Sequence, residues 1–390
     1  MCNRMDKQQI LTLFNSAKVF KAQGELEKSV SCYEEILKIT NKLPEVYFNL
    51  AFVYMDLDRQ NDGIDCLERY LNSEPNDIEA RYFLSTAYFK NKNYEQGYSN
   101  FEYRISKEHA IKTQTQLYGE KYLSIPFWQG EDITDKTVYV YYEAGLGDTI
   151  MYFRYLEVLA SHCKKVYFKP QVQLLSLFAE NRGNVQIIMR FTDEMANECD
   201  YQVPIMSLPY FLGLNNEDIF LGGQPFLHAP KKKAVLYKEK YFNNDKLKIG
   251  IKWQGNTFIG AERAINAYSY KRLFEIENMQ MYSIQVMDGI EQLKDLSEFD
   301  IIDLGFSFKD FSDTISALDN LDIVICNDTS VGHLAGAMGK KCYVILPKNY
   351  DWRWHMDISK CDWYQSVKLF RKNTTWEDVV ERIYKDIKSS

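Results

Sequence analysis

The first hundred residues repeat with a period of 34, and this repeat limits the possible fold more than any other feature of the chain. Small residues recur at Ala17, Ala51 and Ser85, where two helices must approach each other closely. The same step links three further series, which are Phe20, Tyr54 and Tyr88; Ser29, Gly63 and Gly97; and Tyr33, Leu67 and Phe101. Self-similarity at this period predicts stacked helical hairpins that bury their apolar faces against one another.

The alternation of small and aromatic residues at this period resembles the tetratricopeptide repeat. Pro75 closes the second repeat, where the chain has to turn into the next helix. The pattern therefore predicts three tetratricopeptide repeats in residues 1–110, and three is about the minimum for a stable stack. The repeats serve either as a packing scaffold or as a groove for a peptide, and the sequence identifies no ligand for them.

Residues 111–136 lose the helical period and contain Pro126 and two glycines, so they are predicted to connect the repeats to a new domain. Beyond them, short apolar runs alternate with helical stretches, which indicates parallel sheets covered by helices on both faces. The predicted strands are 138–142, 165–168, 185–189 and 201–205, then 248–253, 281–286, 299–304, 321–326 and 341–346. The fold class is thus α plus α/β, with a helical repeat array followed by two Rossmann-like lobes, 137–235 and 246–390.

Ligands of such sheets collect beyond the carboxyl ends of the strands, so polar residues at those ends are candidate site residues. The first predicted strand runs into Gly145, Gly147 and Asp148. Glycines let the backbone approach a ligand closely. Asp148 stands near the start of a helix, where it is suited either to capping that helix or to acting as a general base. The third glycine of the dinucleotide fingerprint is missing.

The second lobe opens with KIGIKWQGN, in which a strand ends at Lys252 and leads into Gln254 and Asn256. Arg263 follows a few residues later. Lys252 is explained either as a surface lysine whose stem lies along apolar neighbours or as part of a polar loop that faces the cleft. All four residues are therefore candidates for a loop at the cleft.

The run CNDTSVGHLAGAMG follows a buried strand and offers more hydrogen-bonding groups than a simple turn requires. Residues 331–338 are predicted to form a helix that Gly339 ends. A helix N-terminus presents unpaired N–H groups and about half a positive charge, so it is suited to binding an anion. Ordinary helix capping is the alternative. The candidate phosphate-binding residues are Asn327, Asp328, Thr329, Ser330, Gly332 and His333.

The composition narrows the class of protein. A formal net charge of -7 argues against a nucleic-acid-binding protein, and the compact basic run 231–233 is predicted to be a solvated loop. No apolar stretch approaches the roughly 18 residues of a membrane helix, and the start MCNRMDKQQI lacks the apolar core of a signal peptide. The 8 cysteines are scattered without a C-x-x-C pair, as expected for free thiols in a reducing cytoplasm. No structural metal is expected from the 5 histidines, since no two lie at ligand spacing.

An aromatic cluster follows the last predicted strand. Its members are Trp352, Trp354, Trp363 and Tyr364. Packing of a C-terminal segment is one explanation, and stacking on a base or a sugar is the other. Asp351 and Arg353 are expected to pair locally.

Taken together, these motifs resemble a known family. GLGDTI and NDTSVGHLAGAMGK are similar to motifs of bacterial glycosyltransferases of GT-B architecture, above all family 9, the ADP-heptose:lipopolysaccharide heptosyltransferases. KIGIKWQGN, KDFSDTISALDNLDIVICNDTSVGHLAGAMGK, DWRWHMD and WYQSVKLFR resemble more closely a subgroup of bacterial proteins that fuse tetratricopeptide repeats to a family-9-like transferase domain. The resemblance covers roughly residues 137–385, and with the repeats it extends over the whole chain.

The resemblance implies an inverting transferase that moves a sugar from a nucleotide-diphosphate sugar to a hydroxyl of a protein or glycan acceptor, without a cofactor or a divalent metal. It gives Asp148 the role of the base, and it assigns the donor phosphates to residues 327–333 with Lys252 beside them. The first lobe would face the acceptor and the second the donor. Two departures are DTSVGH in place of D-[ST]-G-x-x-H, and AERAIN where the subgroup tends to have an Arg-Ser pair.

Two other functions stay open from the sequence. One is a catalytically inactive scaffold or binding protein, against which the presence of Asp148, Asp328 and His333 argues. The other is an epimerase of nucleotide sugars, which also works with two lobes and a cleft. The fused repeats favour a large acceptor over a free sugar nucleotide. The sugar, the base and the acceptor are not given by the sequence.

Overall fold

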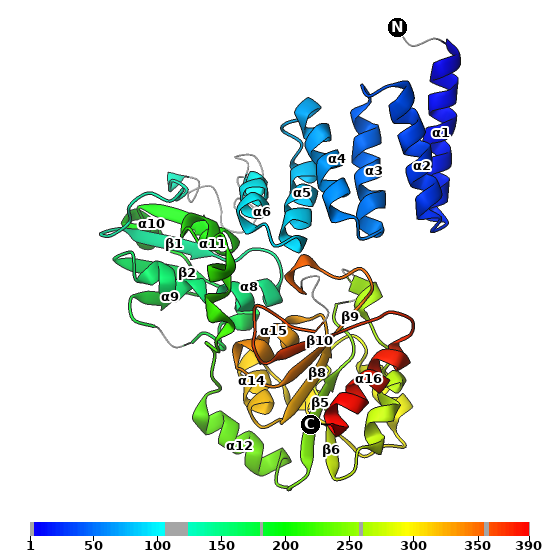
Figure 1. The fold of residues 1–390 in the computed structure, drawn as a ribbon. Helices are drawn as coiled ribbons and strands as arrows, with labels where there is room; N and C mark the ends of the chain where they lie inside the picture. The colour runs from blue at the N-terminus through cyan, green and yellow to red at the C-terminus, as the bar shows by residue number, and fades with distance from the viewer. Residues whose placement is uncertain (1–3, 106–123, 180–181, 257–259, 355–358, 390) are drawn as a thin grey trace. The chain divides into compact units, whose positions relative to one another are not determined.

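The structure is a computed structural model, which describes residues 4–105, 124–179, 182–256, 260–354 and 359–389 (Figure 1). The chain divides into two compact units. Unit 1 comprises residues 1–120 together with 351–356, and unit 2 comprises residues 121–350 and 357–390. The predicted connector, 111–136, lies in part outside the described residues.

Unit 1 consists of helices stacked side by side (Figure 1). The helix pairs are α1 (Arg4–Ala22) with α2 (Leu26–Ile39), α3 (Pro44–Asp56) with α4 (Gln60–Ser73), and α5 (Ile78–Lys90) with α6 (Tyr94–Phe101). One buried apolar cluster runs through helices of all three pairs, from Ala17 to Tyr88. The prediction of a helical repeat array in the N-terminal region is therefore confirmed, and its described residues form three helix pairs.

The turn inside each helix pair keeps the period of 34 in its backbone. The residue with positive φ is Gly24 in the first pair, Asp58 in the second and Lys92 in the third, with φ of 78°, 59° and 58°. In each pair the amide that follows donates to a carbonyl near the end of the first helix, as Arg59 does to Tyr54. The three repeats thus share one backbone geometry although the residue that adopts the left-handed conformation differs.

The small residues of the repeat lie where helices touch. Ser29 is fully buried, and its hydroxyl donates to the carbonyl of Ala17 at 2.8 Å. A Cβ on Gly63 would lie 3.0 Å from Cγ of Met55. A Cβ on Gly97 would lie only 2.4 Å from the ring of Phe89. Close approach of the helices therefore explains why small residues recur at these positions.

Replacing Gly97 with alanine should lower the free energy of unfolding by about 2 kcal/mol, because the new methyl group would overlap the ring of Phe89. Urea unfolding followed by circular dichroism measures the effect. Glu95→Ala is the matched control, since Glu95 is exposed on the same helix and should cost less than about 0.5 kcal/mol. Equal costs for the two variants would contradict the close contact.

Unit 1 also holds a short segment from far along the chain. The ring of Trp352 stacks on Phe89 of α5, with the ring centroids 4.3 Å apart. Trp352 is 3% exposed, and Trp354 is fully buried. Arg353 lies over the ring of Trp352 and pairs with Asp351 at 2.8 Å, as predicted. These two tryptophans therefore serve packing, the first of the two explanations for the aromatic cluster.

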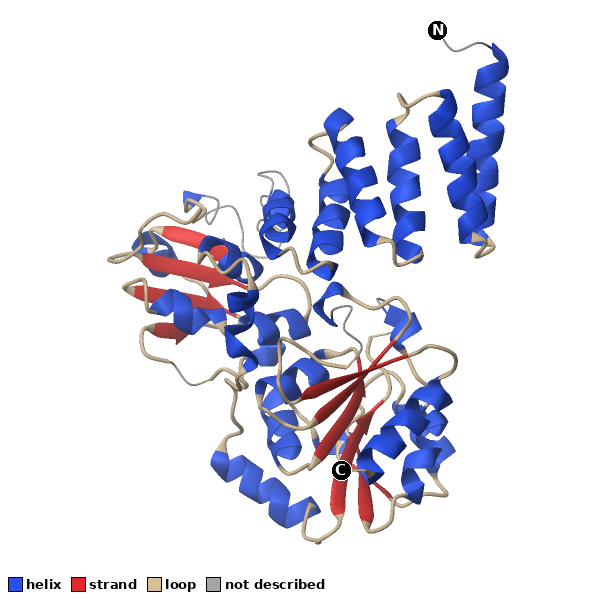
Figure 2. Ribbon diagram, viewed as in Figure 1, coloured by secondary structure: helices blue, strands red, loops and turns tan. Residues whose placement is uncertain are grey.

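Unit 2 contains two parallel sheets, drawn as red arrows in Figure 2. The first has the order β3-β2-β1-β4 and consists of β1 (Thr137–Tyr141), β2 (Lys165–Lys169), β3 (Val185–Ile187) and β4 (Tyr201–Pro204). The second has the order β10-β9-β8-β5-β6-β7, and all of its strand pairs are parallel. Its strands are β5 (Leu247–Lys252), β6 (Met279–Ser283), β7 (Ile301–Asp303), β8 (Ile323–Asn327), β9 (Cys342–Leu346) and β10 (Val367–Arg371). The predicted α plus α/β fold class is confirmed.

Helices alternate with the strands along the chain of unit 2. In the first sheet's region they are α8 (Leu146–Tyr152), α9 (Tyr155–Ala160), α10 (Asp193–Glu198) and α11 (Leu208–Phe211). In the second they are α12 (Lys231–Tyr241), α14 (Phe311–Asp319), α15 (Ser330–Ala337) and α16 (Trp376–Lys388). The core of the second sheet is formed by buried residues of β5, β6, β8, β9 and α16, together with a buried tryptophan, Trp253.

Two elements differ from the sequence prediction. The strand β10 was not predicted, although its residues stand in the quoted run WYQSVKLFR. The lysines 231–233 were predicted to lie in a solvated loop, and this is wrong because they begin α12. Ala234 and Tyr237 of that helix are buried, and this inward-facing pair is what makes the segment helical.

Candidate functional site

The order of the strands in each sheet reverses at one strand, and a ligand is expected near the end of that strand. In the second sheet, β6 and β7 follow on one side of β5, whereas β8, β9 and β10 follow on the other. In the first sheet, β1 lies between β2 and β4. In open parallel sheets, ligands bind beyond the carboxyl ends of the strands where the order reverses. Lys252 ends β5, Asn327 ends β8, and Gly145 follows β1, so the candidate motifs stand at these points.

The turn after β8 is held by an ion pair. Asp328 is 8% exposed, and its carboxylate accepts a hydrogen bond from Nη1 of Arg263 at 3.1 Å. Asn327 is 1% exposed, and its side-chain nitrogen Nδ2 donates to the backbone carbonyl of Arg263 at 3.0 Å. Arg263 was predicted as a loop residue of the cleft, and its observed partners are two of the predicted phosphate-turn residues.

The side chain of Thr329 does not cap the N-terminus of α15. Thr329 occupies the capping position with φ of -144°, but its hydroxyl donates back to the carbonyl of Asn327 at 3.3 Å. Gly332 donates its amide to the carbonyl of Thr329 at 3.0 Å. Ser330 is the first residue of the helix. Capping by the Thr329 side chain, the alternative explanation for this residue, is therefore not what the hydroxyl does.

Lys252 is a buried cation beside this turn. The residue is 6% exposed, and its neighbour in the sheet register is Cys326 on β8. Burial lowers the pKa of the Lys252 ammonium group to about 8, and the nearby Cys326 and Asp288 oppose this shift. Because Lys252 is buried, it is not a surface lysine whose stem lies along apolar neighbours. Its ammonium group loses its charge close to neutral pH.

The loop after β1 meets the start of α15. A Cβ on Gly147 would lie 2.9 Å from Cδ2 of His333 and 3.5 Å from Cα of Ser330. Only a glycine therefore allows α8 to approach α15 this closely. His333 is 4% exposed, and its Nδ1 forms a 3.1 Å hydrogen bond with the hydroxyl of Tyr364. The structure thus brings the first-lobe motif and the predicted phosphate turn together.

Asp148 lies in the first turn of α8, next to Gly147. Its Oδ2 accepts a hydrogen bond from the amide of Gly145 at 2.8 Å, which is a capping contact. Asp148 is half-buried. The capping role considered for this residue is therefore present in the structure. Capping does not prevent Asp148 from acting as a general base, which requires that an acceptor hydroxyl bind within hydrogen-bond distance of its carboxylate.

The loop after β5 is fixed by a glutamine that the sequence did not point to. Gln285 is fully buried; its Oε1 accepts from the amide of Gln254 at 3.1 Å, and its Nε2 donates to the Gln254 carbonyl at 2.9 Å. The Gln254 side chain accepts in turn from Gln292 at 3.0 Å. A Cβ on Gly255 would lie 2.9 Å from Cγ2 of Thr329, and Asn256 is exposed. The predicted residue Gln254 is thus part of the support of the loop.

A buried arginine, Arg154, joins the parts of unit 2 that contain the two sheets. Its Nη1 donates to the carbonyls of Phe220 at 3.1 Å and Trp363 at 3.0 Å, and its Nε donates to Met151 at 3.0 Å. The guanidinium lies 4.9 Å from the ring centroid of Tyr364. Trp363 and Tyr364 are fully buried, so this half of the aromatic cluster also serves packing. In the sequence Arg154 looked like an ordinary residue of a helix.

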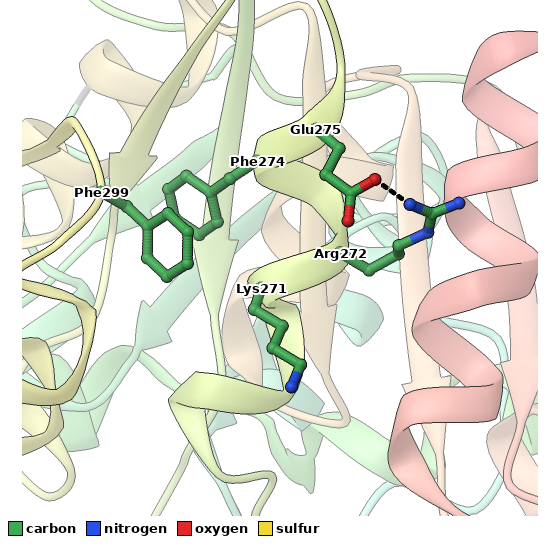
Figure 3. A pocket seen from close by; sticks show the side chains of 5 residues that line it. All are labelled: Lys271, Arg272, Phe274, Glu275 and Phe299. Atoms are coloured by element: carbon green, nitrogen blue, oxygen red, sulfur yellow. Dashed lines mark hydrogen bonds and ion pairs between the residues drawn. The ribbon is translucent and has the colours of Figure 1, made fainter.

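Two pockets of unit 2 lie away from these residues. One of about 240 Å³ is shown in Figure 3, where Phe274 stacks on Phe299 and Arg272 pairs with Glu275 beside Lys271. Another of about 360 Å³ is lined by residues between Trp128 and Leu212. Neither pocket includes a predicted site residue, so the candidate site depends on the strand ends.

In the part of the chain that the structure describes, no group of three or more His, Cys, Asp and Glu side chains could hold a metal ion. None of the described helices combines the length and the apolar character that crossing a bilayer would require.

Comparison with known proteins gives matches to the repeats and a relative that covers most of the chain. The family model described as TPR repeat matches residues 17–58, and that described as tetratricopeptide repeat matches residues 44–77. Protein FlbA of Caulobacter vibrioides is 22% identical over an alignment of 395 residues that covers 92% of this chain. This chain spans 64% of the length of that relative.

Solved structures that match unit 2 have low identity. A glycosyl transferase of family 9 from Veillonella parvula is 11% identical, with a TM-score of 0.49 over 67% of this chain and 91% of that one. ADP-heptose lps heptosyltransferase II of E. coli is 10% identical, with a TM-score of 0.48 over 65% and 98%. The iron-containing dodecameric glycosyltransferase TibC from enterotoxigenic E. coli is 12% identical, with a TM-score of 0.42 over 64% and 67%. Residues 17–77 of the chain thus match tetratricopeptide-repeat models, and an α/β region with two parallel sheets follows them.

Proposed function

We propose that this chain is an inverting glycosyltransferase that moves a sugar from a nucleotide-diphosphate sugar to a hydroxyl group of a protein or glycan acceptor. The acceptor hydroxyl would lose its proton to Asp148 and attack the anomeric carbon, and the nucleoside diphosphate would leave. The contact of the Gly147 loop with the start of α15 carries this proposal, because it brings the loop that contains Asp148 to a helix N-terminus, which is suited to binding an anion.

Two features of the second sheet support the binding of a diphosphate. The side chain of Thr329 does not cap α15, and the amide of Gly332 donates to the carbonyl of Thr329, so the amides of Ser330 and Val331 are the candidates for binding an anion. Lys252 supplies a buried positive charge at the neighbouring strand end. Preorganised donors of this kind lower a barrier by a few kcal/mol each when they face a leaving group.

The proposal is tested by incubating the full chain with a panel of radiolabelled nucleotide sugars and candidate acceptors. Transfer of label supports it, isomerisation of the donor would make the chain an epimerase, and binding without turnover would make it a binding protein. Transfer should continue in EDTA, because the donor phosphates are assigned to amides and a lysine. Loss of transfer in EDTA with recovery in manganese would contradict that assignment.

Binding of a nucleoside diphosphate should weaken above pH 8. Lys252 has a pKa of about 8, so its ammonium group loses its charge as the pH rises through that value. A bound diphosphate favours the charged form, and the dissociation constant should therefore rise by up to about tenfold per pH unit. Titration calorimetry between pH 7 and pH 9 measures this, with the nucleoside diphosphate that gives the largest thermal shift.

Lys252→Met is the control for this titration. The variant should bind more weakly at pH 7, and its dissociation constant should vary much less between pH 7 and pH 9. An equal pH dependence in both proteins would remove Lys252 from the phosphate site.

A catalytically inactive binding protein is the second candidate. One observation favours it, which is that the carboxylate of Asp148 already accepts a hydrogen bond from its own helix start. In this case the strand ends would bind a nucleotide sugar without turnover. The repeats would then act as the docking part of a scaffold, and in the transferase they would hold the acceptor or another partner.

A further inference from the structure

The helix α12 presents an unusual surface. Four of its lysines are exposed, together with the aliphatic residues Val235, which is 52% exposed, and Leu236, which is 63% exposed. Figure 1 shows α12 at the periphery of unit 2, with α14 on its inner side. We define the outer face of α12 by Lys231, Lys232, Val235, Leu236, Lys238 and Lys240.

The inner face of α12 is fully engaged in packing. Lys233 forms an ion pair with Asp313 at 2.6 Å and donates to the hydroxyl of Ser312. The carbonyl of Ala234 accepts from Asn320 at 2.9 Å, and the hydroxyl of Tyr237 forms a hydrogen bond with Ser307. Packing therefore accounts for the inner residues and leaves the outer face without a structural role.

Two of the outer lysines do not help the helix to fold. Lys231 and Lys232 stand in its first turn, where the positive end of the helix dipole disfavours cations. Lys238 and Lys240 stand in the last turn, where the dipole favours them, and the exposed Glu239 lies between them. Within the described residues, none of the four outer lysines forms an ion pair. The positive charge at the start of the helix is thus not explained by stability.

The chemistry of the outer face identifies one kind of partner. Exposed lysines attract an anionic surface, and exposed aliphatic side chains gain by leaving water. A nucleic acid would use the lysines alone, whereas the edge of a lipid bilayer uses both groups. We propose that the outer face of α12 docks this chain on the surface of an anionic lipid bilayer. This proposal does not depend on the transfer reaction.

Docking of this kind is weak and depends on salt. Each lysine near an anionic bilayer strengthens partition by about fivefold, so four of them account for roughly a hundredfold or more. Val235 and Leu236 add to this by entering the boundary between headgroups and acyl chains. The rest of the chain carries excess negative charge, so binding should be lost when the outer lysines are removed.

Flotation with lipid vesicles tests the proposal on the full chain. At low salt the chain should float with vesicles containing one third phosphatidylglycerol, and not with vesicles of pure phosphatidylcholine. The fourfold variant K231Q, K232Q, K238Q and K240Q should lower the partition coefficient by roughly a hundredfold. The variant V235S with L236S should lower it by about tenfold. Physiological salt should weaken binding of the native chain.

The matched control removes four exposed lysines from other elements of unit 2. They are replaced in the variant K164Q, K294Q, K341Q and K385Q. This control has the same net charge as the α12 variant and should float like the native chain. Equal loss in both variants, or equal flotation with neutral and anionic vesicles, would overturn the proposal. A further outcome would also overturn the proposal. If the native chain did not float with vesicles but bound free RNA, and if this RNA binding persisted in the variant V235S with L236S, the partner would be a polyanion and not a bilayer.

Discussion

Replacing Asp148 with asparagine should reduce sugar transfer by about 10²- to 10⁴-fold and leave the affinity for the donor within a few-fold. The loss is the usual contribution of a general base, because an amide cannot take the proton of an acceptor hydroxyl. The asparagine oxygen can still accept from the amide of Gly145, so the cap of α8 should persist. Initial rates and calorimetric titration of the donor measure the two quantities.

Asp378→Asn is the matched control for this variant. Asp378 also lies in the first turn of a helix, α16, and it is exposed. Its replacement should leave transfer unchanged. If Asp148→Asn turned over normally while its melting temperature stayed the same, Asp148 would be a helix cap and the base would be another group. If donor binding failed as well, the loop would be needed for the donor.

Replacing Gly305 with alanine should destabilise unit 2 by about 3 kcal/mol or more. A Cβ at this position would lie 1.8 Å from the carbonyl oxygen of Gln285, and a backbone atom cannot move aside as the end of a side chain can. Gly305 is absent from the residues with positive φ, so the clash and not the backbone conformation is the cause. Urea unfolding monitored by circular dichroism measures the change.

Gly213→Ala separates the clash from the general cost of replacing a glycine. Gly213 has φ of 73°, and nothing lies within 4 Å of its added Cβ. This variant should cost about 1 kcal/mol from backbone strain alone. If both variants lowered the free energy of unfolding by a similar amount, the loop around Gln285 would adjust easily to the added methyl group. Gln285 would then not hold Gln254 rigidly in place.

The features that the sequence predicted are those with a local signal. The period of 34 is visible directly, and the close contacts of Ser29 and Gly97 explain why it is strict. The buried strand before Asn327 and the helix after it were predicted because an apolar run ends in small polar residues. Gly339, with φ of 73°, ends that helix as expected.

The features that it did not predict depend on tertiary contacts. Gln285 is one polar residue at the end of an apolar run, and only the packed loops give its amide its partners. Arg154 has the spacing of an ordinary helical residue, and its partners lie 66 and 209 residues away. The start of α12 was misread because Pro230 and three lysines are typical of a loop, whereas burial of Tyr237 favours the helix.

The packing of residues 351–354 against the repeats has a consequence for how such a chain can arise. A repeat array that is joined only at its end can be gained or lost by one recombination event. Here the stack of Trp352 on Phe89 ties that array to a segment some 260 residues downstream. An exchange at a single junction would leave Trp352 without its partner ring, so the array and this distant segment should be inherited together.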